Sequence, residues 1–225
     1  MLTLPAMLRA ALSALVVTSA LPAGPAGAHP HVWIDTGIEV ILNDRNEAVA
    51  LRIRWTYDEL YSLYIVGDMG LDADWDGKLT PEEEARLSGF DMKWDEGFAG
   101  DTFALSGEAA LELSGPEEFG ASYDGKRITS THLRRLAAPV PVGQVPLIVQ
   151  AYDPGYYVAY SIPEPAVITG GRGCTAQTFV PDLTEAQAAL MEALKEYTPD
   201  VDVEDTFPAV GAQFAEEVRV TCAAP

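Results

Sequence analysis

DADWDGKLTPEE, at residues 72–83, is the stretch from which the organisation of the chain can be worked out. Acidic side chains stand at its first, third and fifth positions, a glycine follows at the sixth, and a glutamate closes it at the twelfth. Calcium takes oxygen ligands, and carboxylates packed into one short loop repel each other unless a cation neutralises them. The predicted calcium ligands are Asp72, Asp74, Asp76, the backbone carbonyl of Lys78, Thr80 directly or through water, and Glu83 with both oxygens.

The sequence on either side of this loop predicts two helices. Residues 55–69 place apolar side chains at helical spacing. Downstream, Thr80 reads as a helix N-cap, with Pro81 at the first helical position and acidic residues in the first turn. A helix, a twelve-residue acidic loop and a second helix form the pattern of an EF-hand, so we predict an EF-hand-like lobe over residues 57–98.

A solvated acidic turn before a helix is the alternative to a calcium loop. EF-hands usually occur in pairs, and the sequence contains no second loop of this pattern. A single loop is more typical of a structural or low-affinity calcium site than of a calcium switch.

Residues 1–28 have the form of a secretory signal peptide. Arg9 lies near the start, an apolar run covers residues 10–21, and small residues precede a cleavage site after Ala28. The apolar run is too short to cross a membrane, and no later stretch is long enough. We therefore expect a periplasmic protein with no stable membrane span after cleavage; a retained N-terminal anchor is the alternative.

The charge balance narrows the class of partner. The chain has 14 Lys and Arg residues against 34 Asp and Glu residues, a formal net charge of −20. Binding to nucleic acid or to an anionic membrane surface needs a basic patch, so neither is expected. An acidic chain attracts cations, although acidic surfaces also keep exported proteins soluble.

Two cysteines, Cys174 and Cys222, are present. In an exported protein the default expectation is a disulfide between them. Free thiols and a thiolate metal site are the alternatives. Neither cysteine has a nearby Cys or His at zinc-ligand spacing, which favours the disulfide.

HPHVWID, at residues 29–35, is the second stretch that carries metal-binding chemistry. If cleavage follows Ala28, the α-amine and imidazole of His29 and the imidazole of His31 can meet one metal ion. Neutral imidazole suits zinc, copper and nickel. A frayed terminus with solvated histidines is the alternative. The third histidine, His132, is either a further ligand or a structural residue.

The remaining sequence is rich in β patterns. Alternating residues predict a hairpin from strands 32–42 and 48–56, and a β pattern resumes after residue 98. We expect strands at 103–105, 109–113, 126–136, 147–152, 156–162, 167–173 and 218–222. A loop is expected at 120–125, a helix from Thr184 to Tyr197 with Thr184 as N-cap, and mixed structure at 207–214. The predicted fold is α+β: one antiparallel β-rich domain over residues 29–225 with an inserted EF-hand-like helix–loop–helix lobe.

Several of these segments, in this order, resemble the DUF1007 family. They are HPHVWID at 29–35, WTYDELYS at 55–62, the acidic loop, AYDPGYY at 151–157, and the late Cys222. The family consists of exported bacterial proteins that tend to accompany nickel/cobalt-type membrane permeases, and some members are implicated in zinc acquisition. The resemblance implies transition-metal binding by His29 and His31. It makes Asp58 and Asp153 candidates for further ligands or for groups that orient an imidazole.

Three functions fit these patterns. The first is a periplasmic binding protein that passes a divalent transition metal, zinc before others, to a membrane permease while calcium braces the helical lobe. The second is a calcium-stabilised structural or interaction module with no transition-metal role. The third, disfavoured by the close spacing of the two histidines, is a copper enzyme with Tyr156 or Tyr157 nearby. No Ser-His-Asp or Cys-His arrangement supports hydrolysis, so a non-enzymatic role is predicted.

Overall fold

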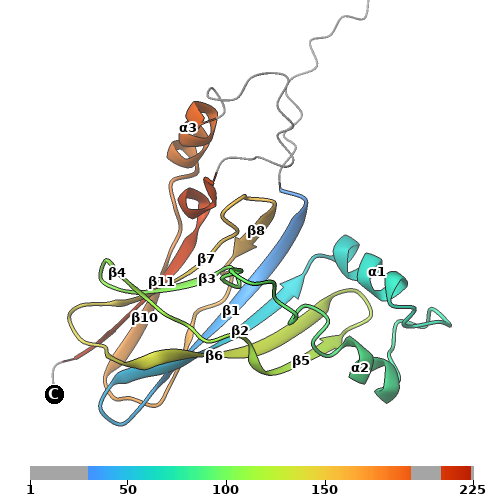
Figure 1. Ribbon diagram of the computed structural model, residues 1–225, viewed down its shortest axis with the longest axis horizontal. Helices are drawn as coiled ribbons and strands as arrows, with labels where there is room; N and C mark the ends of the chain where they lie inside the picture. Colours follow the sequence, from blue (N-terminus) through green and yellow to red (C-terminus); the bar gives the residue numbers. More distant parts are fainter. Residues whose placement is uncertain (1–29, 194–208, 224–225) are drawn as a thin grey trace, which may run out of the picture.

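A computed structural model describes residues 30–193 and 209–223, whose strands form two sheets (Figure 1). The first sheet has the strand order β5-β6-β2-β1-β8, with β9 also pairing to β1, and the second has the order β10-β11-β7-β3-β4. Buried side chains from both sheets make up one hydrophobic core. The predicted signal peptide, His29, and residues 194–197 and 207–208 of two predicted segments lie outside the described residues.

The first sheet contains β1 (Val32–Leu42), β2 (Glu47–Tyr57), β5 (Glu117–Tyr123), β6 (Ile128–Pro141), β8 (Val158–Ser161) and β9 (Val167–Thr169). The second contains β3 (Thr102–Ser106), β4 (Ala109–Leu111), β7 (Leu147–Ala151), β10 (Cys174–Phe179) and β11 (Glu216–Cys222). The helices are α1 (Glu59–Asp68), α2 (Pro81–Leu87), α3 (Leu183–Ala193) and the 3₁₀ helix η3 (Gly211–Phe214). None of the described helices is long and apolar enough to span a bilayer.

The predicted hairpin is confirmed by the antiparallel pairing of β1 and β2. Every second residue of β1 faces the core, and so does every second residue of β2 from Leu51 to Tyr57. The antiparallel register pairs Thr36 with Trp55 and Ile38 with Ile53, and these side chains are buried. Branched and aromatic residues at alternating positions favour such a half-buried strand. The second strand is one residue longer at each end than predicted.

Two strands pair with β1 in a way that the sequence did not indicate. β8 runs parallel to the first residues of β1, and β9 runs parallel to its last residues. The predicted β-rich fold is confirmed, but the first sheet is mixed and not antiparallel throughout. A parallel neighbour needs a long crossover connection, which alternation within one strand does not reveal.

Three predicted boundaries were also wrong. The helix expected from residue 55 begins at Glu59, because Trp55 and Tyr57 still belong to β2 and are buried. Residues 120–123, expected in a loop, belong to β5, whose Tyr123 pairs with Ile128. The helix α3 begins at Leu183, and Asp182, not Thr184, caps it, since its Oδ1 accepts a hydrogen bond from the Thr184 amide at 2.8 Å.

The predicted disulfide between Cys174 and Cys222 is confirmed. The two cysteines stand directly opposite each other in the antiparallel pair β10–β11. They are 48 residues apart in sequence, and α3 lies between them. The disulfide therefore joins the two ends of the segment that contains α3, and both ends belong to the second sheet.

We expect the double substitution Cys174→Ala, Cys222→Ala to lower the free energy of unfolding by about 3–4 kcal/mol, because a closed loop of this length restricts the unfolded chain. Urea unfolding followed by circular dichroism measures this. The wild type with its disulfide reduced is the control and should match the variant. An unchanged unfolding midpoint would show that the bond does not constrain the unfolded ensemble.

Candidate functional site

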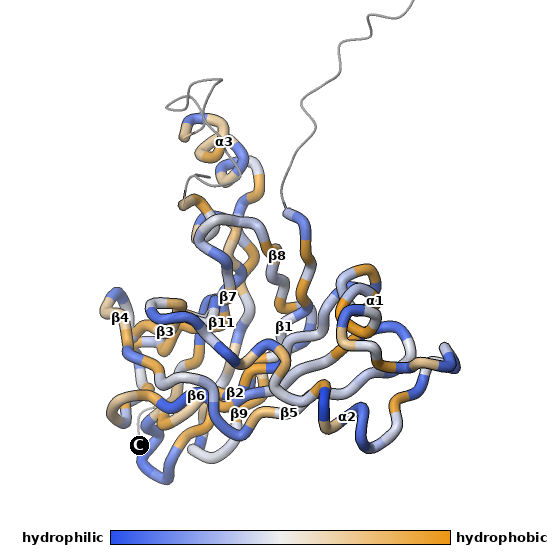
Figure 2. Tube along the Cα trace, turned by 45° about the vertical axis from the view of Figure 1, so that its right-hand side comes forward, coloured by the Kyte–Doolittle hydropathy of each residue, from blue (hydrophilic) through white to orange (hydrophobic). Residues whose placement is uncertain are grey.

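The acidic loop joins α1 to α2 at one end of the molecule, away from β3 and β4 (Figures 1 and 2). Asp72, Asp74 and Asp76 each offer a carboxylate oxygen, and these three atoms lie within 4.8 Å of one another. Asp72 is buried, and the other two are exposed. Within the described ranges, this is the group of three or more metal-ligating side chains that lies close enough to share an ion.

Gly77 gives the loop its sharp turn. Its backbone φ is +78°, a left-handed conformation that glycine adopts without strain. Its amide donates back to the Asp72 carboxylate, with nitrogen–oxygen distances of 3.1 and 3.3 Å. Gly125, in the turn between β5 and β6, lies against Gly77 so closely that a Cβ there would be 2.9 Å from the Gly77 carbonyl oxygen. The hairpin turn therefore supports the acidic loop from behind.

The end of the loop is the predicted helix start. Thr80 and Glu83 form a capping box at the N-terminus of α2, with Pro81 in the first turn. One Glu83 oxygen accepts from the Thr80 amide at 2.8 Å, and the other accepts from the Asp72 amide at 3.0 Å. The bonds from Thr80 hold the pKa of the Glu83 carboxyl below its usual value. The Glu83 carboxylate thus connects the first and last positions of the loop.

The side chain of Lys78 points its ammonium group toward Asp76, at 4.0 Å. The Asp76 Oδ1 also accepts a hydrogen bond from the Lys78 amide at 2.9 Å. Carboxylates gathered around a tight glycine turn are a donor set that suits a hard cation. The three clustered carboxylates therefore fit calcium in the kind of their oxygen atoms, whereas both oxygens of the predicted ligand Glu83 accept backbone amides.

The second predicted site lies at the start of β1. The His31 amide donates to the carbonyl of Tyr157 at 2.8 Å, and the two rings stack with their centroids 4.7 Å apart. His31 is exposed. Its partner in the predicted site, His29, lies outside the described residues.

Asp58 connects the start of β1 to α1. Its Oδ1 caps α1 by accepting from the Tyr61 amide at 2.8 Å, and its Oδ2 accepts from the Trp33 amide at 2.9 Å. The Asp58 amide donates in turn to the Trp33 carbonyl at 2.9 Å. Asp58 therefore lies beside the strand that begins just after His31.

Asp153 organises the turn before β8. Its carboxylate accepts from the amides of Gly155 at 2.8 Å, Tyr157 at 2.9 Å and Val158 at 3.1 Å. These bonds fix Tyr157, whose ring contacts His31. The segments at 29–35, 55–62 and 151–157 thus lie close together around the first residues of β1, and Asp153 bonds the backbone of the tyrosine whose ring stacks on His31.

A family model described as "Protein of unknown function (DUF1007)" matches residues 14–222. The chain belongs to the DUF1007 family. An uncharacterized protein of Haemophilus influenzae is 22% identical over 201 residues, which cover 87% of this chain and 91% of that protein. The predicted family is confirmed, and neither description assigns a function.

The interior of this DUF1007 protein contains His132, for which the sequence left a ligand role and a structural role open, and further polar groups that the sequence did not indicate. His132 is 0% exposed and lies between the rings of Trp55 and Trp94, at centroid distances of 4.7 and 5.5 Å. Burial and the nearby Arg134 lower its pKa to about 4, which keeps the imidazole neutral. On β6 it pairs with Ile53, level with Ile38 of β1, so it lies deep in the sandwich rather than beside His31.

Two buried carboxyl groups accompany His132. Asp101 is 6% exposed and accepts a hydrogen bond from the Tyr160 hydroxyl at 2.7 Å, and burial raises its pKa to about 7. Asp91 accepts from the hydroxyls of Tyr57 at 2.7 Å and Ser130 at 2.5 Å, and burial raises its pKa as well. No local sequence signal identifies these residues, because their burial depends on strands that are distant in sequence.

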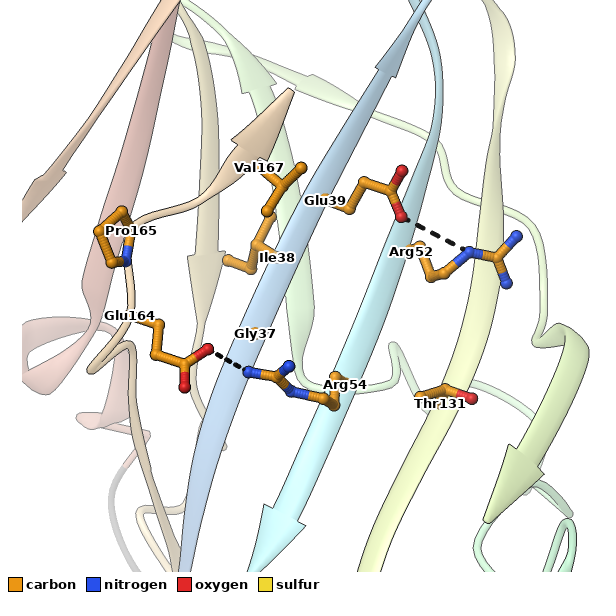
Figure 3. A pocket seen from close by; sticks show the side chains of 9 residues that line it. All are labelled: Gly37, Ile38, Glu39, Arg52, Arg54, Thr131, Glu164, Pro165 and Val167. Atoms are coloured by element: carbon orange, nitrogen blue, oxygen red, sulfur yellow. Dashed lines mark hydrogen bonds and ion pairs between the residues drawn. The ribbon is translucent and has the colours of Figure 1, made fainter. Parts of the chain in front are cut away.

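A groove of about 300 Å³ on the outer face of the first sheet holds a different set of charges (Figure 3). Gly37 allows the Arg54 side chain to lie across β1 and pair with Glu164, since a Cβ at Gly37 would be 3.0 Å from that guanidinium. Arg52 pairs with Glu39 at 3.6 Å and with Glu118 at 3.0 Å. Both arginines of the groove therefore already pair with glutamates of this protein, which makes the groove a weaker candidate site than the acidic loop.

We expect Asp101→Asn to gain stability relative to the wild type as the pH rises. A carboxyl with a raised folded-state pKa stabilises the fold fully only below its unfolded value of 3.8, and that contribution is lost as the pH rises through about 7. The variant should therefore gain on the order of 3 kcal/mol between about pH 4 and pH 8.

Urea unfolding of both proteins across this pH range measures the difference between their free energies of unfolding. His132 is present in both proteins, so its own pH-dependent contribution cancels in this difference. The exposed Asp95→Asn variant is the control and should show a constant offset. A constant offset for Asp101→Asn as well would mean that Asp101 ionises normally in the folded protein.

Proposed function

We propose that the chain is an exported metal-binding protein with calcium in an EF-hand-like loop at residues 72–83. We further propose that it holds a divalent transition metal, zinc before others, at the start of β1 and passes it to a membrane permease. The convergence of the Asp72, Asp74 and Asp76 carboxylates within 4.8 Å is the observation that carries the calcium part. Helices on both sides of the loop and the glycine turn support the same interpretation.

The zinc part rests on the chemistry of the chain start. His31 is exposed at the end of a strand, and its ring is fixed against Tyr157. An accessible imidazole at a chain end suits a site that must release its ion. The proposed permease partner and the proposed periplasmic location rest on the signal-peptide-like residues 1–28 and on the family resemblance of the sequence.

A calcium-stabilised module without a transition-metal role is the second candidate. It is favoured by the hydrogen bonds that the Asp58 and Asp153 carboxylates already accept from backbone amides. Carboxylates used in this way hold loops and strands together without any metal. The two candidates share the calcium site and differ only in zinc binding.

Calcium should raise the melting temperature of the wild type by roughly 5–10 °C at a hundredfold excess over its Kd, because it binds only the folded loop. Asp74→Asn together with Asp76→Asn should abolish most of this rise, since both substitutions keep the side-chain shape and remove the charge. Differential scanning calorimetry with and without chelator measures it.

Glu82→Gln is the matched control, because Glu82 is an exposed acid at the eleventh position of the loop, which is not a ligand position. It should keep the full response to calcium. If the calcium response is the same in all three proteins, the loop is not the binding site.

Zinc titrated calorimetrically into the processed protein should bind in the presence of saturating calcium, which occupies the carboxylate loop. The double substitution His29→Ala, His31→Ala should weaken this binding at least about tenfold, as expected when imidazole ligands are lost.

His132→Phe is the control, because His132 is enclosed by the core and should contribute no zinc ligand. Equal zinc affinity in the wild type and the double variant would eliminate the transition-metal proposal and leave the calcium-stabilised module.

A further inference from the structure

The outward face of α1 is apolar. Leu60, Leu63 and Tyr64 follow one another at helical spacing and are 78%, 48% and 63% exposed, respectively. The opposite side of the same helix buries Ser62 and Val66. A surface helix normally presents polar or charged residues to water, and a helix that is apolar on both sides is normally enclosed. The outward face of α1 therefore suits contact with something other than water.

An exposed tryptophan extends this face at the N-terminal end of the helix. Trp33, on β1, is 53% exposed. Its amide donates to the carboxylate of Asp58, the N-cap of α1, and its carbonyl accepts from the Asp58 amide, both at 2.9 Å. These bonds hold Trp33 beside the first turn of α1. The side chains of Trp33, Leu60, Leu63 and Tyr64 are called the α1 patch below. Exposed apolar groups gathered in this way mark interaction sites.

The composition of the α1 patch is that of a surface that rests on lipid. Leucine side chains enter the boundary of the hydrocarbon, whereas Trp and Tyr side chains prefer the level of the headgroups, because each combines an apolar ring with a polar tip. The patch consists of two leucines, one tryptophan and one tyrosine, with no charged member. It lies at the side of the molecule away from the second sheet (Figures 1 and 2).

The charges beside the patch suit an electrically neutral bilayer. Glu59, next to Leu60, pairs with Lys126 at 3.7 Å, and Asp35 pairs with Arg127 at 2.8 Å. These two acids of a chain with net charge −20 are thus each matched by a cation. Paired charges of both signs complement zwitterionic headgroups. The net charge of the chain opposes an anionic membrane.

The order of the sequence also brings the patch close to a membrane. The apolar run of the predicted signal peptide, at residues 10–21, is the part that enters the membrane during export. Residues 22–29 separate this run from Pro30, where the described chain begins, and Trp33 follows shortly after. A segment of that length spans at most about 28 Å when fully extended. The patch is therefore within reach of the bilayer while the run is in it.

We propose that the α1 patch docks the protein on the surface of a zwitterionic lipid bilayer. Leu60 and Leu63 enter the boundary of the acyl chains, and Trp33 and Tyr64 lie among the headgroups. This contact is reversible and needs no membrane span. It uses neither calcium nor zinc, so it goes beyond the proposed function, and its test is independent of the tests of metal binding.

Flotation of the chain from residue 29 onward with phosphatidylcholine vesicles tests the proposal. This chain lacks the apolar run at residues 10–21, so that run cannot cause binding. The wild type should float with the vesicles. Vesicles that contain anionic phosphatidylglycerol should bind it several-fold more weakly, because the chain is strongly negative. A wild type that does not float, or that prefers the anionic vesicles, would overturn the proposal.

Leu60→Gln together with Leu63→Gln should weaken vesicle binding at least about tenfold, because two side chains that enter the bilayer become polar. Val180→Gln together with Met191→Gln is the matched control, since both residues are exposed and apolar but lie next to or on α3, away from α1 (Figure 1). The control should bind as the wild type does, and both variants should keep the wild-type melting temperature.

Equal vesicle binding by the two double variants would contradict the proposed docking face. Sedimentation without vesicles provides the second measurement. A wild-type dimer that dissociates only in the Leu60, Leu63 variant would also overturn the proposal, because a second copy of the chain would then cover the patch.

Discussion

The hydrogen bonding of β1 is the constraint on which the rest of the structure depends. This strand pairs with β2 along most of its length, with β8 at its start and with β9 at its end. The carboxylate of Asp58 binds the Trp33 amide from one side, and the turn organised by Asp153 delivers Tyr157 to His31 from the other. The residues around the start of β1 are therefore positioned by a strand that pairs with its own hairpin partner and with two strands that are distant in sequence.

Opposite electrostatic problems arise at the two ends of the molecule. In the acidic loop, carboxylates approach one another, and two of the three are open to solvent, which lowers the cost of their mutual repulsion. Around β3 and β6, one guanidinium is enclosed by carbonyl dipoles and an aromatic ring, with no acidic partner among the described residues. The first arrangement gathers negative charge near the surface, and the second holds a positive charge in the interior. A chain of strongly negative net charge can present both because burial, not net charge, sets the local potential.

Local patterns predicted the local structure well. Alternation along residues 32–42 predicted β1, and Thr80 followed by Pro81 predicted the start of α2. The prediction failed where two periodicities overlap, as at Trp55, whose apolar neighbours suit a helix and a strand equally. It also failed where the cause lies far away in sequence, as for the parallel pairing of β8 and for the buried Asp101 and Arg134. The residues of the acidic loop were predicted individually, because all of its candidate ligands are close in sequence.

The hydrogen bonds already made by each carboxylate rank the predicted metal ligands. An ionised carboxylate has about four acceptor positions. Asp153 accepts three backbone amides and Asp58 accepts two, whereas Asp74 accepts no hydrogen bond from the described residues. A cation that binds Asp153 directly has to share the single remaining position, but one that binds Asp74 meets an uncommitted carboxylate. Asp153 is therefore better suited to orienting His31 through Tyr157 than to direct ligation, and Asp58 is the better candidate for a direct oxygen ligand beside that histidine.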